Sequence, residues 1–425
     1  MNKNNFLKIK KLLKFVYNNP YSDFYRTKYK KAGFNPLTDF KSIKDIKKIP
    51  FLTKKELLNA NFSKLLFVNK KDVLCVKSTS GTTGKPLYIF YSKLDGINKW
   101  ILKKDLGRVL VLVDPINIYY LSLDITNNGF LPLNGNIHNL PATVRMAADL
   151  QINTVYSSPT LIIILNDYLK DYPIVKKSLK YFYLFGEIIN HRKKKLLQKL
   201  YPGVTIILSY GTIETATIGF QCKYLVKRGN QIYYHPRFDW VHIEIVNPDT
   251  EEEVKPGEKG EIVITNFYLR GTPIIRYKIG DLVSLKEEKN CSCGFPGPLL
   301  QVWGRANYDY VKAGGFELRR EFLEKIIDNS KSFLKDSFEA HIYENFENNK
   351  PKIRIELNLS LKKGVQESIF LKQRVEKELL ETWQISSKLK LKKAIEAGLF
   401  EPIKINFIGL PASFKSKKTL ILHQL

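Results

Sequence analysis

The chain has 425 residues, of which 44% are hydrophobic and 12% aromatic, a composition typical of folded proteins and too apolar for a disordered one. At this length we expect two or more domains. Lys and Arg outnumber Asp and Glu by 69 to 41, a formal charge of +28, yet the basic residues are scattered and no nucleic-acid motif accompanies them. The charge therefore favours a lysine-rich solvated surface, or acidic small molecules or an acidic carrier protein as partners, over nucleic acid.

The sequence shows no pattern of a membrane span or a leader peptide. The longest apolar run, Leu161–Leu165, is far too short to cross a bilayer, and lysines interrupt the apolar residues of the N-terminal segment. We therefore expect a cytoplasmic protein. Residues 1 to about 70 are predicted to be helical, and Thr53 with Glu56 has the pattern of a capping box at a helix start.

The densest polar stretch is Lys77-Ser-Thr-Ser-Gly-Thr-Thr-Gly-Lys-Pro86, between predicted strands at residues 72–76 and 87–91. Its glycines allow the backbone to approach a ligand, and its hydroxyl and ammonium groups are donors for anionic oxygens, so we expect a loop that wraps a polyphosphate. A P-loop is excluded because position 79 is threonine and a strand follows Lys85. A Ser/Thr/Gly-rich surface hairpin is the alternative. The candidate phosphate ligands are Ser78, Ser80, Gly81, Thr82, Thr83, Gly84 and Lys85.

From residue 100 to 220, short apolar runs alternate with helical patterns, as in βαβ units around a buried parallel sheet. Ligands of such sheets bind beyond the carboxyl ends of the strands. Two strands end there in the polar turns Phe185-Gly-Glu187 and Ser209-Tyr-Gly-Thr-Ile-Glu214. The predicted strands are 109–113, 118–121, 154–156, 181–185 and 204–208, and the predicted helices are 141–150, 159–169 and 190–200.

These two turns carry groups suited to a nucleotide. Their glycines leave room for a flat base, the tyrosine offers a ring face, the threonine a hydroxyl, and the last glutamate a carboxylate oxygen suited to Mg²⁺. Either turn alone is a common loop, so the prediction depends on their order behind the phosphate loop. The candidate residues are Gly186, Glu187, Tyr210, Gly211, Thr212 and Glu214.

Residues 221–305 alternate apolar residues with turn signals, so we expect β structure there. The stretch Thr272–Leu282 includes Gly280, which allows a turn that presents the carboxylate of Asp281. A fixed carboxylate at this position can accept hydrogen bonds from both hydroxyls of a ribose. An acidic turn residue after a strand is the alternative.

Four cysteines in a reducing compartment are not expected to form disulfides. Cys291-Ser-Cys293 is a tight knuckle with one residue between its cysteines. Cys222 and His235 lie upstream of it, separated from it by a stretch rich in predicted strands, and Cys75 lies apart from the others. Three thiolates and an imidazole are ligands that tetrahedral Zn²⁺ takes, and four protein ligands leave no open position, so we expect a structural zinc and not a catalytic one. The alternative for His235 is a surface histidine.

The remaining sequence is typical of a small α+β unit. It follows Trp303-Gly-Arg305 and the pair Gly314-Gly315, which we expect to be flexible backbone. We therefore predict an α/β fold with a large N-terminal domain, residues 1–305, that contains mixed and parallel sheets and a β-rich part at 221–305. A small mobile α+β C-terminal domain, residues 306–425, completes the prediction.

The motifs and their order resemble those of the adenylate-forming superfamily. Ser-Gly-Thr-Thr-Gly-Lys-Pro86 resembles its nucleotide-binding loop, and Tyr-Ser-Lys-Leu-Asp95 resembles its phenylacetate-CoA ligase branch. The stretches Ser22–Tyr29 and Ile49–Leu58 resemble the N-terminal signature of these ligases and their capsule-biosynthesis relatives. The turn ending at Glu187 resembles the adenine-contacting turn of the family, and the turn ending at Glu214 its Tyr-Gly-x-Thr-Glu motif. The stretch ending at Asp281 resembles its Tyr-Arg-Thr-Gly-Asp motif, with isoleucine in place of the threonine.

This resemblance implies an AMP-forming acid–thiol ligase. A small carboxylic acid attacks the α-phosphorus of Mg-ATP, an acyl-AMP forms, pyrophosphate leaves, and a thiol then takes the acyl group. The resemblance also implies that Arg305 contacts ribose or phosphate and that a hinge follows it. Asn307-Tyr308 stands where an acidic pair is usual, which leaves the hinge residue open.

The family pattern also implies an adenylation lysine near the C-terminus. Counting from Pro411 identifies Lys417, with Ser416 where glycine is usual, and Lys415 and Lys418 remain as alternatives. The resemblance makes CoA the default acceptor and an aryl- or arylacetate-CoA ligase the favoured function. A loading enzyme for a phosphopantetheine-bearing acyl carrier protein is one alternative, and a non-catalytic relative that binds a nucleotide or acyl-AMP is another. The sequence predicts neither the identity of the acid nor the oligomeric state.

Overall fold

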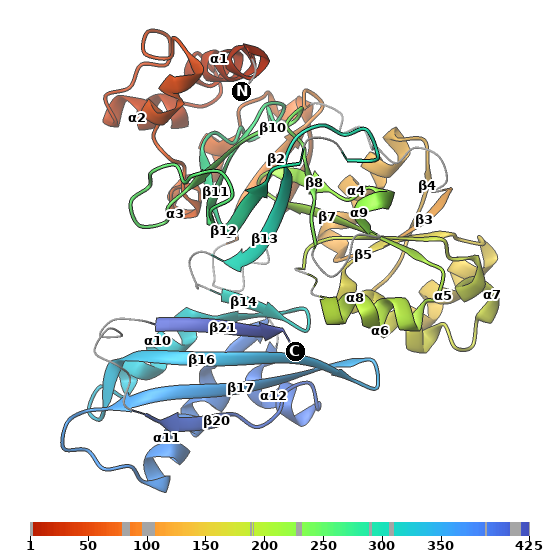
Figure 1. Cartoon of the computed structure of the whole chain (residues 1–425), viewed down its shortest axis with the longest axis vertical. Helices are drawn as coiled ribbons and strands as arrows, with labels where there is room; N and C mark the ends of the chain where they lie inside the picture. The colour runs from red at the N-terminus through yellow and green to blue at the C-terminus, as the bar shows by residue number, and fades with distance from the viewer. Residues whose placement is uncertain are drawn as a thin grey trace.

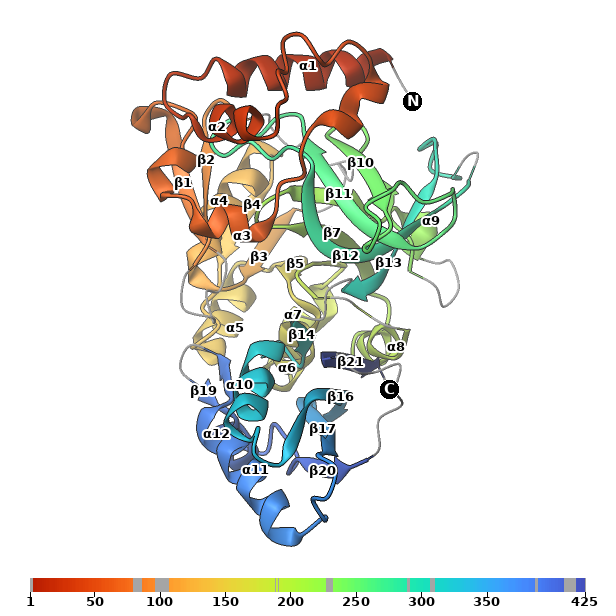
Figure 2. The ribbon, with the colours of Figure 1, turned by 90° about the vertical axis from the view of Figure 1, so that its left-hand side faces the viewer.

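The computed structural model describes residues 3–78, 86–95, 107–187, 189, 191–226, 232–288, 291–305, 310–386, 389–408 and 418–424. Its parts are stacked along the long axis, with the N-terminal helices at one end and the C-terminal part at the other (Figures 1 and 2). The predicted α/β fold class is confirmed by its mixture of helices with parallel and antiparallel sheets. The domain boundary at residue 305 stays a prediction. No helix within the described ranges is long and apolar enough to cross a membrane.

Short helices form the N-terminal segment and pack against the β-rich part. The predicted capping box is confirmed, because Thr53 N donates to Glu56 Oε2 at 2.9 Å and Glu56 N donates to Thr53 Oγ1 at 3.3 Å. The Tyr25 hydroxyl donates to the carbonyl of Pro273 at 2.8 Å and so ties this segment to a distant one. The helices are α1 (Lys3–Tyr17), α2 (Phe24–Lys31), η1 (Ile43–Lys48), α3 (Lys54–Asn59), η2 (Phe62–Leu65) and η3 (Lys70–Asp72).

A mixed sheet forms the centre of the larger part. Its strands are β3 (Arg108–Leu112), β4 (Leu131–Asn134), β5 (Thr154–Ser157), β6 (Tyr181–Leu184), β7 (Thr205–Thr212), β8 (Ala216–Phe220) and β9 (His235–Pro236). They lie in the order β4-β3-β5-β6-β7-β8-β9, parallel as far as β7 and antiparallel after it. The helices are α4 (Pro115–Asn127), α5 (Leu140–Asp149), α6 (Pro159–Tyr168), α7 (Pro173–Ser178), α8 (His191–Leu200) and α9 (Lys223–Val226).

The two faces of this sheet are covered by different helices. Leu110 and Leu112 of β3 belong to the cluster that includes α5 to α8, whereas Val109 and Val111 belong to a cluster with α4. Alternate residues of a strand point to opposite faces, so α4 covers one face and α5 to α8 the other. Burial on both faces explains why these strands are continuous apolar runs.

The strand predicted at 118–121 is wrong, because these residues lie within α4. Leu121 and Ile125, four residues apart, are both buried against the sheet, as one face of a helix requires. A short run of Ile, Tyr and Leu fits a strand and a buried helix equally well. The edge strand beside β3 is instead β4, whose Pro132 weakened the strand signal.

The β-rich part is an antiparallel sheet in the order β10 (Val241–Val246), β11 (Gly260–Asn266), β12 (Tyr277–Lys286) and β13 (Leu299–Arg305). The pairing of β12 with β13 places Asp281 opposite Arg305. The strands flanking the phosphate loop, β1 (Val73–Ser78) and β2 (Tyr88–Ser92), form an antiparallel pair. The predicted strand-to-strand connection around this loop is therefore confirmed.

The C-terminal part has a hydrophobic cluster of its own, from Val311 to Leu420. Its sheet has the order β20-β17-β16-β21. Gly314 and Gly315 have φ of +57° and +83° and form the two-residue turn of a hairpin, a tighter structure than the flexible backbone expected. The elements are β14 (Tyr310–Ala313), β15 (Phe316–Arg319), α10 (Arg320–Asn329), β16 (Leu334–Glu347), β17 (Lys350–Leu361), α11 (Ile369–Thr382), β18 (Gln384–Ser386), β19 (Leu389–Lys390), α12 (Leu391–Glu396), β20 (Lys404–Phe407) and β21 (Lys418–Gln424).

Candidate functional site

Two stretches predicted to contact the substrate lie outside the described residues. Ser78 ends β1 opposite Tyr88, and the loop begins directly after it. The candidates beyond this point, Ser80, Gly81, Thr82, Thr83, Gly84 and Lys85, are not among the described residues, and neither is Lys417. The structure therefore fixes the base of the phosphate loop, and the roles of these residues stay predictions.

Lys77, one of the two lysines of this loop, is surrounded by aromatic rings. Its Nζ lies 3.7 Å from the centre of the Tyr120 ring and 4.4 Å from that of Tyr91. Burial lowers the pKa of Lys77 to about 8. The ring faces stabilise an ammonium that has lost most of its water. Lys77 thus fastens the base of the loop to β2 and α4.

Two buried carboxylates are each held by a tyrosine hydroxyl. Glu214 is 6% exposed and Asp281 5% exposed. The Tyr210 hydroxyl donates to Asp281 Oδ2 at 2.7 Å, and the Tyr277 hydroxyl donates to Glu214 Oε1 at 3.1 Å. Hydrogen bonds to buried charged groups are among the stronger ones in proteins, so these carboxylates have fixed orientations.

The turn that carries Glu214 is fixed from several directions. The Tyr91 hydroxyl donates to the carbonyl of Ile213 at 2.7 Å. Thr212 Oγ1 lies 2.9 Å from Thr215 Oγ1, within the same turn. A Cβ on Gly211 would lie 2.2 Å from the Ala216 carbonyl oxygen, so the close pairing of β7 with β8 requires glycine there.

The turn after β6 contains Gly186 and Glu187. Gly186 has φ of +81°, a conformation that favours glycine. Glu187 Oε2 accepts a hydrogen bond from Thr160 Oγ1 at 2.6 Å and lies 3.3 Å from Lys193 Nζ. The carboxylate of Glu187 is therefore already bound to α6 and α8.

The structure brings Tyr210 and Asp281 together and places the backbone of Arg305 opposite Asp281. Glu214 contacts Tyr277, which lies in the same strand as Asp281. Sequence reasoning missed Tyr277 and Lys193 as partners of site residues. Tyr277 lies four residues before Asp281 in the same strand, but the register shift in the pairing of β11 with β12 lies between them, so the regular alternation of side chains does not identify it. No sequence signal identifies Lys193, whose partners lie in other elements.

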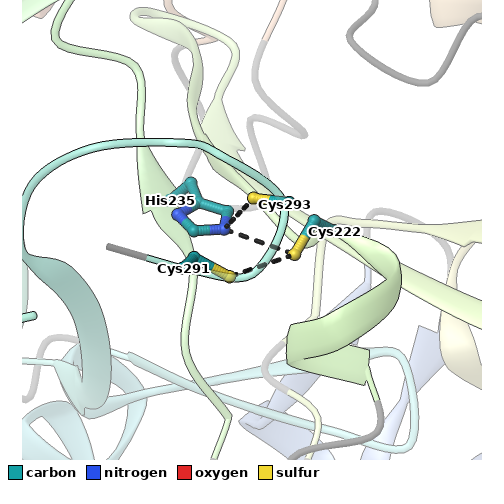
Figure 3. Close-up of side chains that lie close together, drawn as sticks. All are labelled: Cys222, His235, Cys291 and Cys293. Atoms are coloured by element: carbon teal, nitrogen blue, oxygen red, sulfur yellow. Dashed lines mark hydrogen bonds between the residues drawn. The ribbon is translucent and has the colours of Figure 1, made fainter. Parts of the chain in front are cut away.

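A second site is formed by Cys222, His235, Cys291 and Cys293, whose ligand atoms all lie within 4.8 Å of one another (Figure 3). The His235 Nε2 is 3.3 Å from the Sγ of Cys222 and 3.3 Å from that of Cys293. Cys222 Sγ and Cys291 Sγ are 3.7 Å apart. We call these four residues the Cys/His cluster.

The Cys/His cluster has the donor set and size of a tetrahedral zinc site. Zn–S bonds of about 2.3 Å place sulfur ligands about 3.8 Å apart, close to the distances seen here. Burial lowers the pKa of His235 to about 4, so its ring is neutral, the form that binds metals. Burial raises the pKa of Cys222 to about 12, so a thiolate there needs a cation beside it.

Comparisons with known proteins agree with this geometry. A family model described as AMP-binding enzyme matches residues 128–269. The phenylacetate-coenzyme A ligase of Pseudomonas putida is 23% identical over 370 residues, which cover 81% of this chain and 79% of that one. The phenylacetate-coenzyme A ligase of Thermus thermophilus is 26% identical over 314 residues, which cover 69% and 68%.

Solved structures show the same fold. A 2-hydroxyisobutyryl-CoA ligase in complex with 2-HIB-AMP and CoA, in the thioesterification state, matches with a TM-score of 0.70 and 17% identity over 99% of this chain and 89% of that one. The same ligase in the postadenylation state matches with a TM-score of 0.61 and 15% identity over 98% and 88%. Residues 128–269 thus match the AMP-binding enzyme family, and the chain as a whole is similar in sequence to phenylacetate-coenzyme A ligases.

Proposed function

We propose that the chain is an ATP-dependent acid–CoA ligase, most simply one for aryl or arylacetic acids. The observation that carries the proposal is the pair of buried carboxylates, Glu214 and Asp281, held by tyrosine hydroxyls. They lie beside the sheet edge where ligands of parallel sheets bind. The phenylacetate-coenzyme A ligases that the chain resembles support the class of acid.

In the first half-reaction a carboxylate oxygen of the acid attacks the α-phosphorus of ATP, and the bond to pyrophosphate breaks. Asp281 accepts hydrogen bonds from the ribose hydroxyls, and Glu214 would hold Mg²⁺ through a carboxylate oxygen. When bound, Mg²⁺ neutralises phosphate charge. The reaction needs no protein nucleophile, so these groups act by positioning and charge stabilisation.

In the second half-reaction the thiol sulfur attacks the acyl carbon, the thiol proton is lost, and AMP leaves with its electron pair on the phosphate oxygen. Lys417 would bridge acid and phosphate in the first half-reaction only, since the resemblance implies that the C-terminal domain rotates between the two half-reactions. Replacing Lys417 with Met should slow acyl-AMP formation about 100-fold while ATP still binds. The matched variants K415M and K418M should keep the wild-type rate.

The Cys/His cluster supports a second proposal, a structural zinc ion bound by Cys222, His235, Cys291 and Cys293. Their distances fit the edges of a zinc tetrahedron, and all four positions are taken by protein. Metal analysis of protein purified without chelators should find one zinc per chain. Protein that folds and ligates with no bound metal would contradict this proposal.

An acidic acyl carrier protein is the second candidate acceptor, favoured by the formal charge of +28. The deciding experiment measures ATP-dependent pyrophosphate release, with hydroxylamine trapping the acyl-AMP, across aryl, arylacetic, fatty and amino acids. CoA and a phosphopantetheinylated carrier protein are then compared as acceptors of the best acid. ATP binding without pyrophosphate release from any acid would favour a non-catalytic relative.

A further inference from the structure

Lys193 connects the two parts of the molecule through a buried group of charges. Its Nζ lies 2.8 Å from Glu344 Oε1 and 3.3 Å from Glu187 Oε2, and its side chain is 4% exposed. Glu187 belongs to the turn after β6, whereas Glu344 belongs to β16 of the C-terminal part. A single ammonium therefore bridges two carboxylates, one from the turn after β6 and one from the C-terminal sheet.

Further hydrogen bonds extend the contact on both sides. Glu344 Oε1 accepts a hydrogen bond from the backbone N–H of Gly314 at 2.6 Å, at the tip of the β14–β15 hairpin. On the other side, Thr160 Oγ1 donates to Glu187 Oε2 at 2.6 Å. A Cβ on Gly315 would lie 3.7 Å from the Thr160 methyl carbon and 4.0 Å from Glu187 Oε1. The hairpin tip thus rests against the turn that resembles the adenine-contacting turn.

Figures 1 and 2 show the same arrangement, because α6 and α8 face the C-terminal sheet in both views. A hydrogen bond at the edge of the contact joins Asn349 Nδ2 to Asp167 Oδ1 at 2.7 Å. The Asp167 side chain is 30% exposed, whereas those of Glu187 and Glu344 are 10% and 6% exposed. The buried centre of the contact is therefore the group around Lys193.

The charges in this centre depend on one another. Burial by itself would lower the pKa of Lys193, but the two carboxylates outweigh it, so the pKa is raised and the ammonium stays charged. Removing the ammonium would leave two buried carboxylates without their shared counterion. The group therefore favours the arrangement in which Glu344 meets Lys193.

We infer that Lys193 is a positioning residue for thioester formation, an inference that rests on the proposed function. Its ammonium seats the β14–β15 hairpin against the nucleotide turn by holding Glu187 and Glu344 at once. The arrangement seen here matches the 2-hydroxyisobutyryl-CoA ligase better in its thioesterification state, with a TM-score of 0.70, than in its postadenylation state, with 0.61. A different placement of the C-terminal part during adenylation would separate Glu344 from Lys193 and leave the contact with Glu187 in place. Lys193 therefore acts mainly in the second half-reaction.

The test compares K193M, which keeps an apolar side chain but removes the ammonium, with wild type. We expect transfer of the acyl group from pre-formed acyl-AMP to CoA to slow about 10-fold and acyl-AMP formation to change less than about 2-fold. Amide hydrogen exchange of peptides covering residues 310–319 should become faster, because the acceptor of the Gly314 N–H loses its anchor. K193R, which keeps the charge, should recover part of the transfer rate.

K195M is the matched control, because Lys195 lies on the same helix and is exposed. It should match wild type in both half-reactions and in hydrogen exchange. An equal loss in the two half-reactions of K193M, or unchanged exchange at 310–319, would overturn the inference. If wild type forms no acyl-AMP from any acid, the proposed function fails separately, and the exchange measurement still decides whether Lys193 seats the hairpin.

Discussion

The Cys/His cluster and the carboxylate pair, Glu214 with Asp281, are both assembled from distant segments, but they are stabilised differently. The short contacts of the cluster, 3.3–3.7 Å, join its own prospective ligand atoms to one another. Each carboxylate instead accepts a hydrogen bond from a tyrosine hydroxyl: Asp281 from Tyr210, and Glu214 from Tyr277. The proposed zinc would complete the cluster, whereas the carboxylates are already oriented by hydrogen bonds from the protein.

The largest expected effect is on the cluster. Replacing Cys291 and Cys293 together with Ser should abolish zinc binding and lower the melting temperature more than any other change discussed. A structural zinc supplies roughly 10–16 kcal/mol to isolated zinc fingers, so even a fraction of that would dominate here. Metal analysis and thermal unfolding measure both effects. C75S, whose cysteine lies outside the cluster, should bind zinc and unfold like wild type.

Removing the charge of Glu214 should impair the carboxylate pair and leave the Cys/His cluster intact. E214Q should slow acyl-AMP formation by about 100-fold or more, because a metal-binding carboxylate becomes a neutral amide. Its zinc content and melting temperature should match those of wild type. A large drop in melting temperature would instead show that Glu214 mainly stabilises the fold. The carboxylate pair would then be a structural site, as the Cys/His cluster is proposed to be.

Variants of the two tyrosines test whether their hydroxyls orient the carboxylates before a ligand binds. Y210F and Y277F each remove one hydroxyl and keep the ring, and each should lower adenylation about 10-fold, the worth of a hydrogen bond to a charged group. For Y210F we expect the loss to take the form of a higher KM for ATP, since Asp281 would bind ribose. For Y277F we expect the loss to take the form of a higher Mg²⁺ concentration needed for adenylation. Unchanged kinetics in both variants would mean that the carboxylates need no support.

His242 provides a buried histidine outside the cluster, for comparison with His235. Burial, with a contribution from the charge of Arg276, lowers the pKa of His242 from 6.5 to about 4. Below about pH 6.5 the unfolded chain therefore binds a proton at His242 that the folded protein does not bind. The contribution of neutral His242 to the free energy of unfolding is full above pH 6.5 and is lost as the pH drops toward 4.

The expected loss is about 1.4 kcal/mol per pH unit in this range. Urea unfolding of wild type and H242Q between pH 7 and pH 4.5 measures it, and the variant should show a shallower decline. Equal slopes would indicate that His242 is protonated in the fold. H242Q should also keep its zinc, whereas H235Q should lose it.

Much of this fold could be predicted because its signals are local. Apolar runs separated by helical patterns identified β3, β5, β6 and β7, and turn residues separated the strands of the β-rich part. The error at 118–121 arose where a run of four residues carries no period long enough to distinguish helix from strand. The cysteine pair and its two partners could be predicted from residue type alone, since few other groups bind zinc.

The network around Lys193 could not be predicted, because its contacts depend on tertiary packing. Lys193 and Glu344 are 151 residues apart, and neither lies in a motif. In a chain with 69 basic residues, a lysine that becomes buried between carboxylates has no distinguishing neighbourhood in sequence. The family motifs indicate the groups proposed to bind the nucleotide, whereas the groups that join the two parts of the molecule require the folded structure.

The connection between β12 and β13 has a consequence for how the sheet pairs during folding. It carries Cys291 and Cys293, and the strands that it joins carry Asp281 and Arg305 at opposed positions. A slip of one residue in this pairing would turn every side chain of a strand to the other face of the sheet. Binding of the two cysteines to the proposed zinc would anchor the loop and select one register. A chain without that anchor could form both strands with Asp281 on the wrong face of the sheet.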